Sequence, residues 1–475
     1  MKKWPWIIGI LVALLVVVVT TRKPDRQVAT GEQIVVKVWD WGVSQQKIYE
    51  EQFAKFMEKN PDLKIEHQVI QSGQYDNLLQ LAHKNNNVPD IFWQPGSLKV
   101  VELVEMGWIE PLTEYIGKNK DNFAPNSFVS GNNVIGGEIY TFPDMEPRTG
   151  VYTPLYWNKK LFKQVGLEGP PKNWTELREY ARKITKAGKG KFYGFILGGK
   201  EDFCWDMNIT ALAGENGAPT GGLDYQQGKY DYNKPAFIEA YKILKALEQD
   251  GSIFPGFMAL DDEQARAYFA TDRAAMVIGG IWNIGGWKKY PNIEYAVAPI
   301  PLPDEGPRSK RGYGGGGGPW MMSSKSKNKE AVGRVIAFLT SLEFTQACVE
   351  GGLGISCMPK ANEAIQDPRL RELLEIAEQR TIIRPEPLLR NMELAYVNRY
   401  ESKLPPTKTS LVSVVLEAWT TKGDIVKGLR ELTVEANKRF GEMIKLARKD
   451  GHKVKLEDYH FPDFNPLTDF QGTEK

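Results

Sequence analysis

The sequence predicts an α/β protein built from two lobes. The chain has 475 residues, which is longer than one compact hydrophobic core commonly supports. From Ile34 onward, short apolar strands alternate with amphipathic helices, and repeated strand–helix units predict a parallel sheet. The composition, 42% hydrophobic and 25% charged, is typical of a soluble globular body. We therefore expect two lobes of ordinary domain size.

The first part of the chain carries the clearest strand and helix patterns. The segment IVVKVWDW, from Ile34, predicts a strand, and a helix is expected to start at Ser44 and to stop at residues 60–62. One face of that helix is aromatic at positions i, i+4 and i+7, namely Tyr49, Phe53 and Phe56. The next elements are expected in the order strand 63–70, helix 75–86, strand 89–93 and helix 98–106. The carboxyl ends of parallel strands share one edge of a sheet, so Trp41 and Trp93 are expected at one rim.

The stretch 151–186, VYTPLYWNKKLFKQVGLEGPPKNWTELREYARKITK, predicts a strand followed by two capped helices. Asn158 is placed to cap the first helix, and Gly166 can end it in the left-handed conformation that a side chain resists. Asn173 and Glu176 form a capping box for the second helix. Behind that box one face is apolar at helical spacing: Leu177, Tyr180, Ala181 and Ile184. The stretch is a packing unit, and no residue in it is expected to be catalytic.

The order of these parts resembles the internal signature of extracellular solute-binding proteins of family 1, the receptors that hand sugars to bacterial ABC importers. In both, an aromatic residue, Asn-Lys, a Leu-Phe helix, Pro-Pro-Lys and Trp-x-Glu-Leu follow one another. Residues 268–282, YFATDRAAMVIGGIW, resemble the family's helix, turn and strand, with Thr-Asp-Arg in place of the usual Gly-Lys turn. The proline- and glycine-rich segment 298–343 and the final helices extend the resemblance, which covers residues 34 to about 448.

The resemblance implies a periplasmic-binding-protein-like (type II) fold with two discontinuous lobes and a ligand cleft between them. We expect the chain to cross between the lobes near residues 141–150, 298–303 and 351–359. The expected parts are an N-terminal lobe of 34–145 with 300–355, a C-terminal lobe of 146–299 with 356–450, and a surface-hugging or mobile tail of 451–475.

The amino end predicts export. Lys2 and Lys3 precede an apolar run that ends near residue 21, and a polar tether is expected over 22–33. No cysteine follows the run for lipoprotein attachment, and small residues for cleavage come late. Residues 1–21 are therefore compatible with a cleaved signal peptide or with an uncleaved membrane anchor. Either alternative places the body on the extracellular face of the cytoplasmic membrane or in the periplasm.

Charge, cysteine and histidine usage exclude several classes of function. A net charge of +2 argues against a nucleic-acid partner. The three cysteines, Cys204, Cys348 and Cys357, match no zinc site and no disulfide framework. A single Cys348–Cys357 bridge and buried free thiols remain alternatives. The four histidines show no metal-pair spacing, so no metal and no cofactor is expected.

Ligand recognition is expected from tryptophans beside polar side chains. A sugar ring offers C–H patches for aromatic stacking and a rim of hydroxyls for hydrogen bonding. Any one of the 13 tryptophans can instead be a core residue, which is the reading preferred for Trp39 and Trp157. Positions after strands select four candidate pairs: Trp41 with Ser44, Trp93 with Gln94, Trp205 with Asp206, and Trp282 with Asn283. The resemblance implies stacking positions for Trp93 and Trp282 and a polar contact near Asp206.

Four further residues complete the expected site. Glu146 and Arg148 lie in the first crossing, where a charged group can bind two neighbouring hydroxyls; a solvated hinge loop is the alternative. Gly316 belongs to a glycine stretch that lacks the Lys-Ser or Lys-Thr of a nucleotide-binding loop, so we expect a backbone wall against the ligand or a flexible crossover. Arg390 lies where the family's second lobe supplies a late contact.

These features predict a receptor that closes on a carbohydrate, an oligosaccharide by expectation, and delivers it to the membrane subunits of an ABC permease. We expect a monomer without enzymatic activity. No acidic pair stands out with the apolar setting that a glycosidase requires, yet a cell-surface glycoside-active enzyme remains one alternative. The other keeps the fold but binds another solute, such as a polyamine or a phosphodiester.

Overall fold

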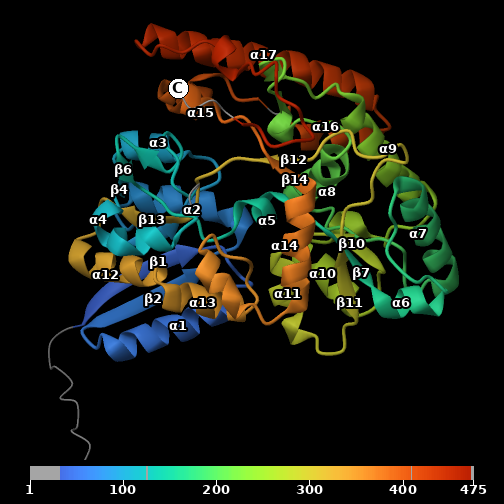
Figure 1. The fold of residues 1–475 in the computed structure, drawn as a ribbon, viewed down its shortest axis with the longest axis horizontal. Coiled ribbons are helices and arrows are strands. Elements are labelled where there is room, and N and C mark those ends of the chain that lie inside the picture. Colours follow the sequence, from blue (N-terminus) through green and yellow to red (C-terminus); the bar gives the residue numbers. More distant parts are fainter. Residues whose placement is uncertain (1–32, 125–126, 408, 472–475) are drawn as a thin grey trace, which may run out of the picture.

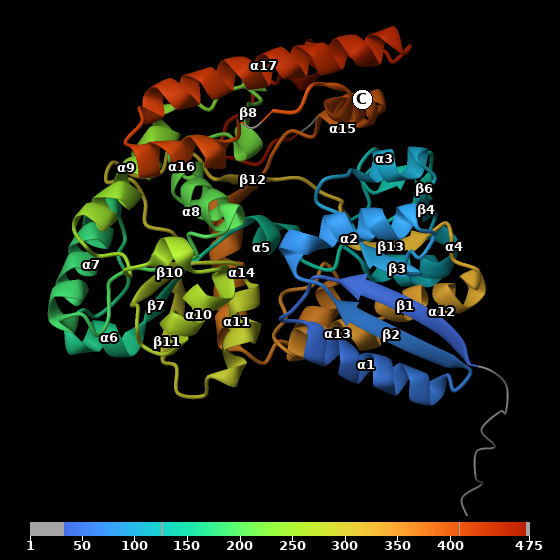
Figure 2. The ribbon, with the colours of Figure 1, turned by 180° about the vertical axis from the view of Figure 1, so that it is seen from behind.

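The computed structural model describes residues 33–124, 127–407 and 409–471. The expected export segment, 1–21, and all but the last residue of the expected tether, 22–33, lie outside the described residues. The described chain forms two α/β halves that stand side by side, with one long helix, α17 (Ile425–Lys449), running across the top (Figures 1 and 2).

A five-stranded sheet forms the centre of the first half, in the order β2-β1-β3-β13-β4. The strands are β1 (Ile34–Asp40), β2 (Leu63–Val69), β3 (Ile91–Trp93), β4 (Ile109–Glu110) and β13 (Trp320–Ser323). β1 pairs in parallel with β2 and β3, as the strand–helix units predict. β13 runs antiparallel to β3 and β4, so the expectation of a wholly parallel sheet is wrong. The antiparallel strand enters from a distant part of the chain rather than through a strand–helix unit.

Helices cover this sheet on both faces. They are α1 (Gln46–Lys59), α2 (Ser72–Lys84), α3 (Val100–Glu105), α4 (Thr113–Ile116), α12 (Lys329–Leu339) and α13 (Leu342–Glu350). α1 packs on β2 and α13, and α12 packs on β1 and α4. α1 begins at Gln46 without a side-chain cap, so Ser44 precedes it, but its predicted face of Tyr49, Phe53 and Phe56 is buried.

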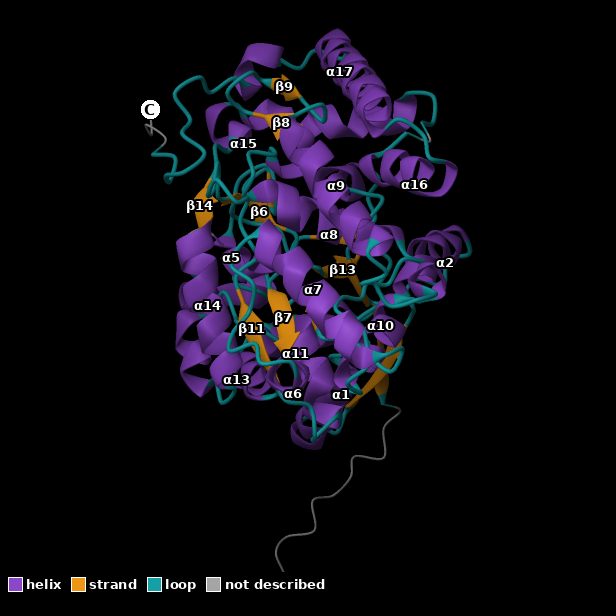
Figure 3. Cartoon of the chain, turned by 90° about the vertical axis from the view of Figure 1, so that its right-hand side faces the viewer, coloured by secondary structure: helices purple, strands orange, loops and turns teal. Residues whose placement is uncertain are grey.

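The second half has a three-stranded antiparallel sheet in which β7 (Leu155–Asn158) lies between β10 (Met276–Ile278) and β11 (Tyr295–Ala298). Its helices are α5 (Pro147–Val151), α6 (Lys159–Gln164), α7 (Trp174–Gly188), α8 (Asp202–Gly214), α9 (Pro235–Gln249), α10 (Asp262–Ala270), α11 (Trp282–Gly286) and α14 (Pro368–Arg380). α8 is nearly enclosed, since it packs on α9, β10 and α16 (Leu411–Thr421). Figure 3 shows these helices wrapped around the small sheet.

The capping chemistry predicted for residues 151–186 is confirmed. The Asn158 side chain accepts a hydrogen bond from the Leu161 amide at 2.9 Å, and Gly166 has φ of 67°. Asn173 accepts from the Glu176 amide at 2.8 Å. The return bond of the box differs, because the Glu176 carboxylate accepts from the amide of Lys172 instead of Asn173. The apolar face of α7 is buried at Leu177, Ala181 and Ile184.

The carboxyl-terminal part forms a roof over both halves. It contains β14 (Thr381–Ile383), which pairs in parallel with β12 (Arg311–Tyr313), and continues through α15 (Pro387–Arg390), the 3-10 segment η7 (Met392–Lys403), α16 and α17. Two hairpins, β5 (Val134–Ile135) with β6 (Glu138–Ile139) and β8 (Leu223–Asp224) with β9 (Lys229–Tyr230), lie beneath it. The remaining short 3-10 turns are Gly117–Asn122, Thr220–Gly222, Phe257–Ala259, Trp287–Lys289, Pro359–Ala364 and Leu456–Tyr459.

The tail after α17 is docked on the surface as far as residue 471. The Phe461 amide donates to the carbonyl of Tyr225 at 2.7 Å, and the Phe470 amide donates to the carbonyl of Ile383 at 2.8 Å. Of the two expected behaviours, the described part of the tail shows the surface-hugging one.

Connections between the halves lie close together. The Glu146 amide donates to the Ile355 carbonyl at 2.8 Å, so the first and third expected crossings are adjacent. The glycine stretch after β12 leads into β13, and side-chain amides of Asn132 and Asn133 hold its carbonyls at 3.0 and 3.1 Å. Because β12 pairs with β14, we propose that the second crossing is 314–319 rather than 298–303; the other lobe limits stay predictions.

The expected membrane segment, 1–21, lies outside the described residues, whereas the three cysteines lie within them. Within the described residues, no single helix has both the length and the apolar character to cross a bilayer, and the bent pair α12 and α13 meets that test only jointly. Cys204, Cys348 and Cys357 are free thiols, so the disulfide alternative is wrong. Burial raises the pKa of each thiol well above its usual range, which makes all three weak nucleophiles.

Candidate functional site

The two halves enclose a cavity of about 560 Å³ at the carboxyl ends of β1 and β3. The first half contributes Trp41, Ser44 and Trp93, and the second half contributes Phe203 and Trp282. We call this cavity the aromatic chamber. The structure thus brings together four of the expected residues, from both sides of the cleft.

Buried hydrogen bonds of Asp40 fix the loop that carries Trp41. One oxygen of the Asp40 carboxylate lies 2.6 Å from the Nε2 atom of His67, and the other accepts from the Gly42 amide at 2.7 Å. Asp40 and the His67 side chain are almost fully buried. A Cβ atom on Gly42 would lie 3.1 Å from the ring of Trp93, so the loop packs tightly against that ring. The side chains that follow β1 are therefore held in place before any ligand arrives.

The aromatic rings of the first half differ in how much surface they offer. Trp41 packs edge-to-face on Trp93 at 5.1 Å and on Tyr75 at 4.7 Å. Trp93 in turn packs edge-to-face on Trp320 at 5.5 Å and is only 4% exposed. Trp41 is half-buried and presents free ring surface to the chamber. Trp93 supports Trp41 and has little surface left for a ligand, contrary to the stacking position expected for it.

On the opposite wall, a glycine allows Trp282 to lie over the main chain. A Cβ atom on Gly280 would lie 2.1 Å from the Trp282 ring. The neighbouring Asn283 is 1% exposed and packs on Gly279. Its amide atoms have no hydrogen-bond partner within the described residues. Trp282 therefore lines the chamber, whereas Asn283 belongs to the core beneath it.

The aromatic chamber is rich in carboxylates. One guanidinium, that of Arg266, is accompanied by five acidic side chains: Asp76, Glu201, Asp261, Asp262 and Glu263. Asp262 pairs with Arg266 at 2.9 Å, and burial raises the pKa of Asp262 although that arginine opposes the rise. Such a surplus of acceptors suits ligand hydroxyls or ammonium groups and opposes anions.

A second cavity, of about 950 Å³, has lining residues that neighbour those of the first along the chain. Phe203 of α8 faces the aromatic chamber, and Asp206, Thr210 and Gly214 follow at helical spacing on the wall of the second cavity. We call the second cavity the large chamber. One face of α8 therefore runs along both chambers.

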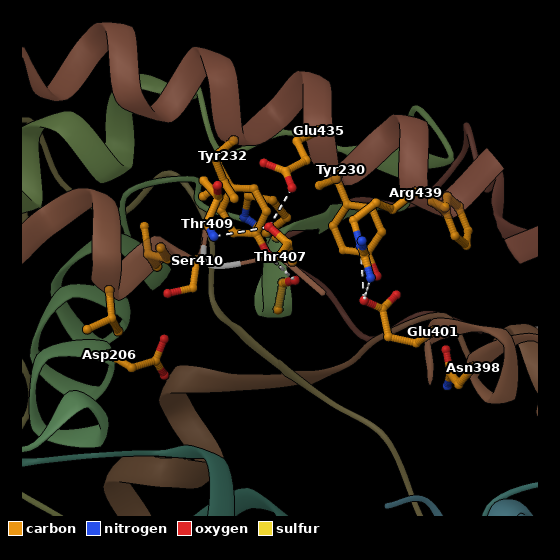
Figure 4. Close-up of a pocket in the computed structure, with 18 of the residues that line it drawn as sticks. Asp206, Tyr230, Tyr232, Asn398, Glu401, Thr407, Thr409, Ser410, Glu435 and Arg439 are labelled. Atoms are coloured by element: carbon orange, nitrogen blue, oxygen red, sulfur yellow. Dashed lines mark hydrogen bonds and ion pairs between the residues drawn. The ribbon is translucent and has the colours of Figure 1, made fainter. Parts of the chain in front are cut away.

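The roof supplies about half of the residues that line the large chamber (Figure 4). The rings of Tyr230 and Tyr232 stack with centroids 6.2 Å apart and an interplanar angle of 11°. Arg439 of α17 binds the Glu401 carboxylate of η7, with its Nε atom at 3.0 Å. These walls come from segments far apart in the sequence, so no local sequence pattern could predict that they lie together.

Besides Trp282 and Asn283, two more of the four expected pairs are separated by the structure. Trp205 is fully buried, packs edge-to-face on Trp419 at 4.8 Å, and donates from Nε1 to the Gly199 carbonyl at 2.9 Å; its expected ligand contact is wrong because the ring lies in the core. Its partner Asp206 lines the large chamber. Gln94 donates to the Leu98 carbonyl at 2.9 Å and lines neither chamber.

The four further residues also lie outside both chambers. The Glu146 carboxylate accepts from the Thr149 amide at 3.0 Å and so caps α5, while Arg148 lies over the Tyr313 ring at 5.1 Å. Gly316 packs on Asn132 and Asn133 of the first half.

Arg390 holds the tail. Its guanidinium donates to the His460 carbonyl at 2.8 Å and lies 3.7 Å from the ring of Phe461. These groups belong to the chain after α17, so the residue is structural rather than ligand-facing.

One lining residue that the sequence could have indicated is Phe203, which is 42% exposed at the start of α8. On a helix, Phe203, Asp206 and Thr210 fall on one face, away from Trp205. An aromatic residue at helical spacing from an acidic one, on the face opposite the apolar residues, was the available signal.

Comparisons with known proteins agree with this architecture. The family model described as bacterial extracellular solute-binding protein matches residues 41–344. A putative binding protein of Brucella abortus is 28% identical over 346 residues, covering 70% of this chain and 77% of that protein. The sn-glycerol-3-phosphate-binding periplasmic protein of Salmonella typhimurium is 25% identical over 305 residues, covering 61% of this chain and 66% of that protein.

Solved structures share the fold. The maltose/maltodextrin-binding domain of Bdellovibrio bacteriovorus bound to maltotriose has a TM-score of 0.65 at 22% identity, covering 86% of this chain and 100% of that chain. The Streptomyces glaucescens receptor solved with and without acarbose has a TM-score of 0.68 at 17% identity, covering 87% and 100%. The predicted two-lobe, periplasmic-binding-protein-like α/β fold is confirmed. With a family match over well more than half of its length, the chain belongs to the bacterial extracellular solute-binding proteins.

Proposed function

We propose that the protein is the substrate-binding component of an ABC importer and that it binds a carbohydrate between its two lobes. The observation that carries the proposal is the aromatic chamber, where Trp41 faces a wall containing Phe203 and Trp282. Aromatic rings stack on the C–H faces of a sugar, and the surrounding carboxylates accept hydrogen bonds from its hydroxyls. Neutral polyols match both features at once.

Closure couples binding to delivery. Contacts from Trp41 and from Trp282 belong to different halves, so a ligand gains both sets only when the halves are together. The ligand then shifts the population toward the closed form by its differential affinity. A permease that recognises the closed form receives loaded receptor.

The excess of carboxylates over cations in the aromatic chamber distinguishes between the alternative ligands. It disfavours a phosphodiester or another anion, because each added negative charge would lie among five carboxylates and one arginine. The same surplus favours a cation, so a polyamine is the second candidate. Related structures were solved with maltotriose, α-D-tagatose and raffinose, and these ligands support a sugar as the first candidate.

Turnover is not part of the proposal. Two of the five chamber carboxylates are already engaged by main-chain amides: Asp76 accepts from the Gly96 and Ser97 amides at 3.0 and 2.8 Å, and Asp261 caps α10. A glycosidase needs one carboxyl free to donate a proton and a second free to attack or to activate water. Incubation with oligosaccharides should therefore release no new reducing ends.

Binding can be tested by tryptophan fluorescence and titration calorimetry with maltose, maltotriose, raffinose, xylobiose, tagatose, sn-glycerol-3-phosphate and spermidine. We expect at least one sugar to bind, and Trp41→Ala to weaken it at least tenfold, or about 1.4 kcal/mol. Tyr396→Ala serves as the matched aromatic control, because that ring lies outside both chambers and stacks on His452. A response to spermidine or to the phosphate ester, with none to any sugar, would overturn the proposal.

We also propose an exported monomer held at the extracellular face of the membrane by its amino-terminal segment. The basic and apolar residues 2–21 support export, and the family is extracellular by description. Amino-terminal sequencing of the mature protein tests the anchor: a start at Met1 supports it, and a start beyond residue 21 shows cleavage instead.

A further inference from the structure

We propose that the large chamber is the second part of the ligand site, so that the ligand is a linear oligosaccharide long enough to occupy both chambers. The inference rests on the proposed carbohydrate-binding function and specifies its substrate class. Three observations support it: the continuity of the chambers, unsatisfied polar groups in the second one, and its charge balance.

Residues on both sides of the cleft support continuity between the aromatic chamber and the large chamber. On α8, Phe203 lines the aromatic chamber, and Asp206, one turn later, lines the large chamber. On the first half, Gly96 lines the aromatic chamber and the adjacent Ser97 lines the large one. A chain of sugar rings stacked near Trp41 therefore has a path into the second cavity.

The large chamber holds polar groups that the protein leaves without partners. The Asp206 side chain is exposed at the wall of this chamber and makes no hydrogen bond with any described residue, and partial desolvation by the surrounding protein raises its pKa although Arg311 opposes the rise. Arg311 donates from its terminal nitrogens to the carbonyls of Thr210 and Val151, but its buried Nε–H has no partner among the described residues. A carboxylate and a guanidinium facing one cavity supply the acceptor and the donor that a sugar's vicinal hydroxyls require.

Size and charge identify the occupant. The aromatic chamber alone, about 560 Å³, already matches the volume of an ordinary small-molecule site, and the large chamber adds about 950 Å³. The charges in the large chamber are nearly balanced. Its three cationic side chains are Lys99, Arg311 and Arg439, and its four anionic side chains are Glu102, Asp206, Glu401 and Glu435. The stacked rings of Tyr230 and Tyr232 add an aromatic wall. A neutral chain fits this setting better than a strongly charged one.

Titration calorimetry with two homologous series, glucose to maltohexaose and xylose to xylohexaose, tests the inference. In whichever series binds, we expect the Kd of the wild-type protein to fall at least tenfold from the disaccharide to the pentasaccharide. Asp206→Ala should remove most of that gain and leave the Kd of the shortest bound ligand within twofold. Asp206→Asn, which keeps one acceptor oxygen, should retain part of the gain.

Asp202→Ala is the matched control, since Asp202 lies one turn before Asp206 on α8, is exposed, and lines neither chamber. It should keep the full length dependence. A Kd that is the same for every chain length, or an Asp206→Ala variant that weakens short and long ligands equally, would overturn the inference and leave the carbohydrate receptor intact. If no sugar of any length binds, the inference fails together with the proposed function.

Discussion

Replacing Trp93 with alanine separates the structural role of this ring from the ligand-binding role that its sequence position suggests. The ring is 4% exposed and is clamped edge-to-face between Trp41 and Trp320 at 5.1 and 5.5 Å. Removing a buried tryptophan leaves a void that neighbouring rings fill only in part, and such changes cost about 3–5 kcal/mol. We expect Trp93→Ala to lower the free energy of unfolding by that amount.

Trp41→Ala provides the contrast. That ring is half-buried and borders the aromatic chamber, so part of its surface is already outside the core. We expect a loss of about 1–2 kcal/mol in the free energy of unfolding, together with the loss of sugar affinity stated above.

Both variants should be measured by urea denaturation without ligand, with sugar binding measured separately under native conditions. The m-value must match that of the wild-type protein for the midpoints to report stability. If Trp93→Ala unfolds within 1 kcal/mol of wild type and still loses all sugar binding, then Trp93 is a ligand face and the division of roles drawn from burial is wrong.

Two other predictions concern single residues. Burial, reinforced by the charge of Asp40, raises the pKa of Asp144 to about 6; an acid with a raised pKa destabilises the fold when ionised. Asp144→Asn should therefore be more stable than wild type at pH 7.5 by up to about 3 kcal/mol, with the advantage lost as the pH falls from 6 to 4; equal urea midpoints at both ends would contradict this. Gly280→Ala should push Trp282 aside and weaken sugar binding at least tenfold with little change in Tm, whereas Gly73→Ala, at an open helical site, should leave affinity unchanged.

Local chemistry made much of the fold predictable. Asn158 and Asn173 cap helices because their side chains can reach the amides three residues later, which depends only on neighbouring sequence. The buried face of α1 follows from helical spacing. The antiparallel insertion of β13 could not be foreseen in the same way, because it pairs residues more than 200 positions apart.

The candidate site was only partly predictable because adjacency in sequence is not adjacency in space. Consecutive residues on a helix point about 100° apart, so Trp205 enters the core while Asp206 enters the large chamber. Trp282 and Asn283, at the start of α11, separate for the same reason. Trp41 and Ser44 lie in a loop, where the helical rotation between neighbours does not apply, and both line the aromatic chamber.

Arg390 shows that a residue at a position expected from the family resemblance to bind ligand can have a structural role instead. The resemblance implied a late ligand contact at this residue, but its guanidinium donates to three carbonyls of the tail after α17. The tail, 451–475, lies outside the part of the chain that resembles the family, residues 34 to about 448. Contacts with the tail therefore occupy the guanidinium that was expected to face a ligand.

The same reasoning limits what family membership says about the ligand. One relative binds sn-glycerol-3-phosphate by name, and at 25% identity the fold is kept while lining residues are free to change. Two opposite unit charges 4 Å apart gain about 4 kcal/mol at an effective dielectric constant near 20, and like charges lose as much. A phosphate placed in the aromatic chamber has Arg266 to attract it, and Asp76, Glu201 and Asp261 are among the five acids that repel it. The chamber's own charges, rather than its relatives' names, thus argue against an anionic solute.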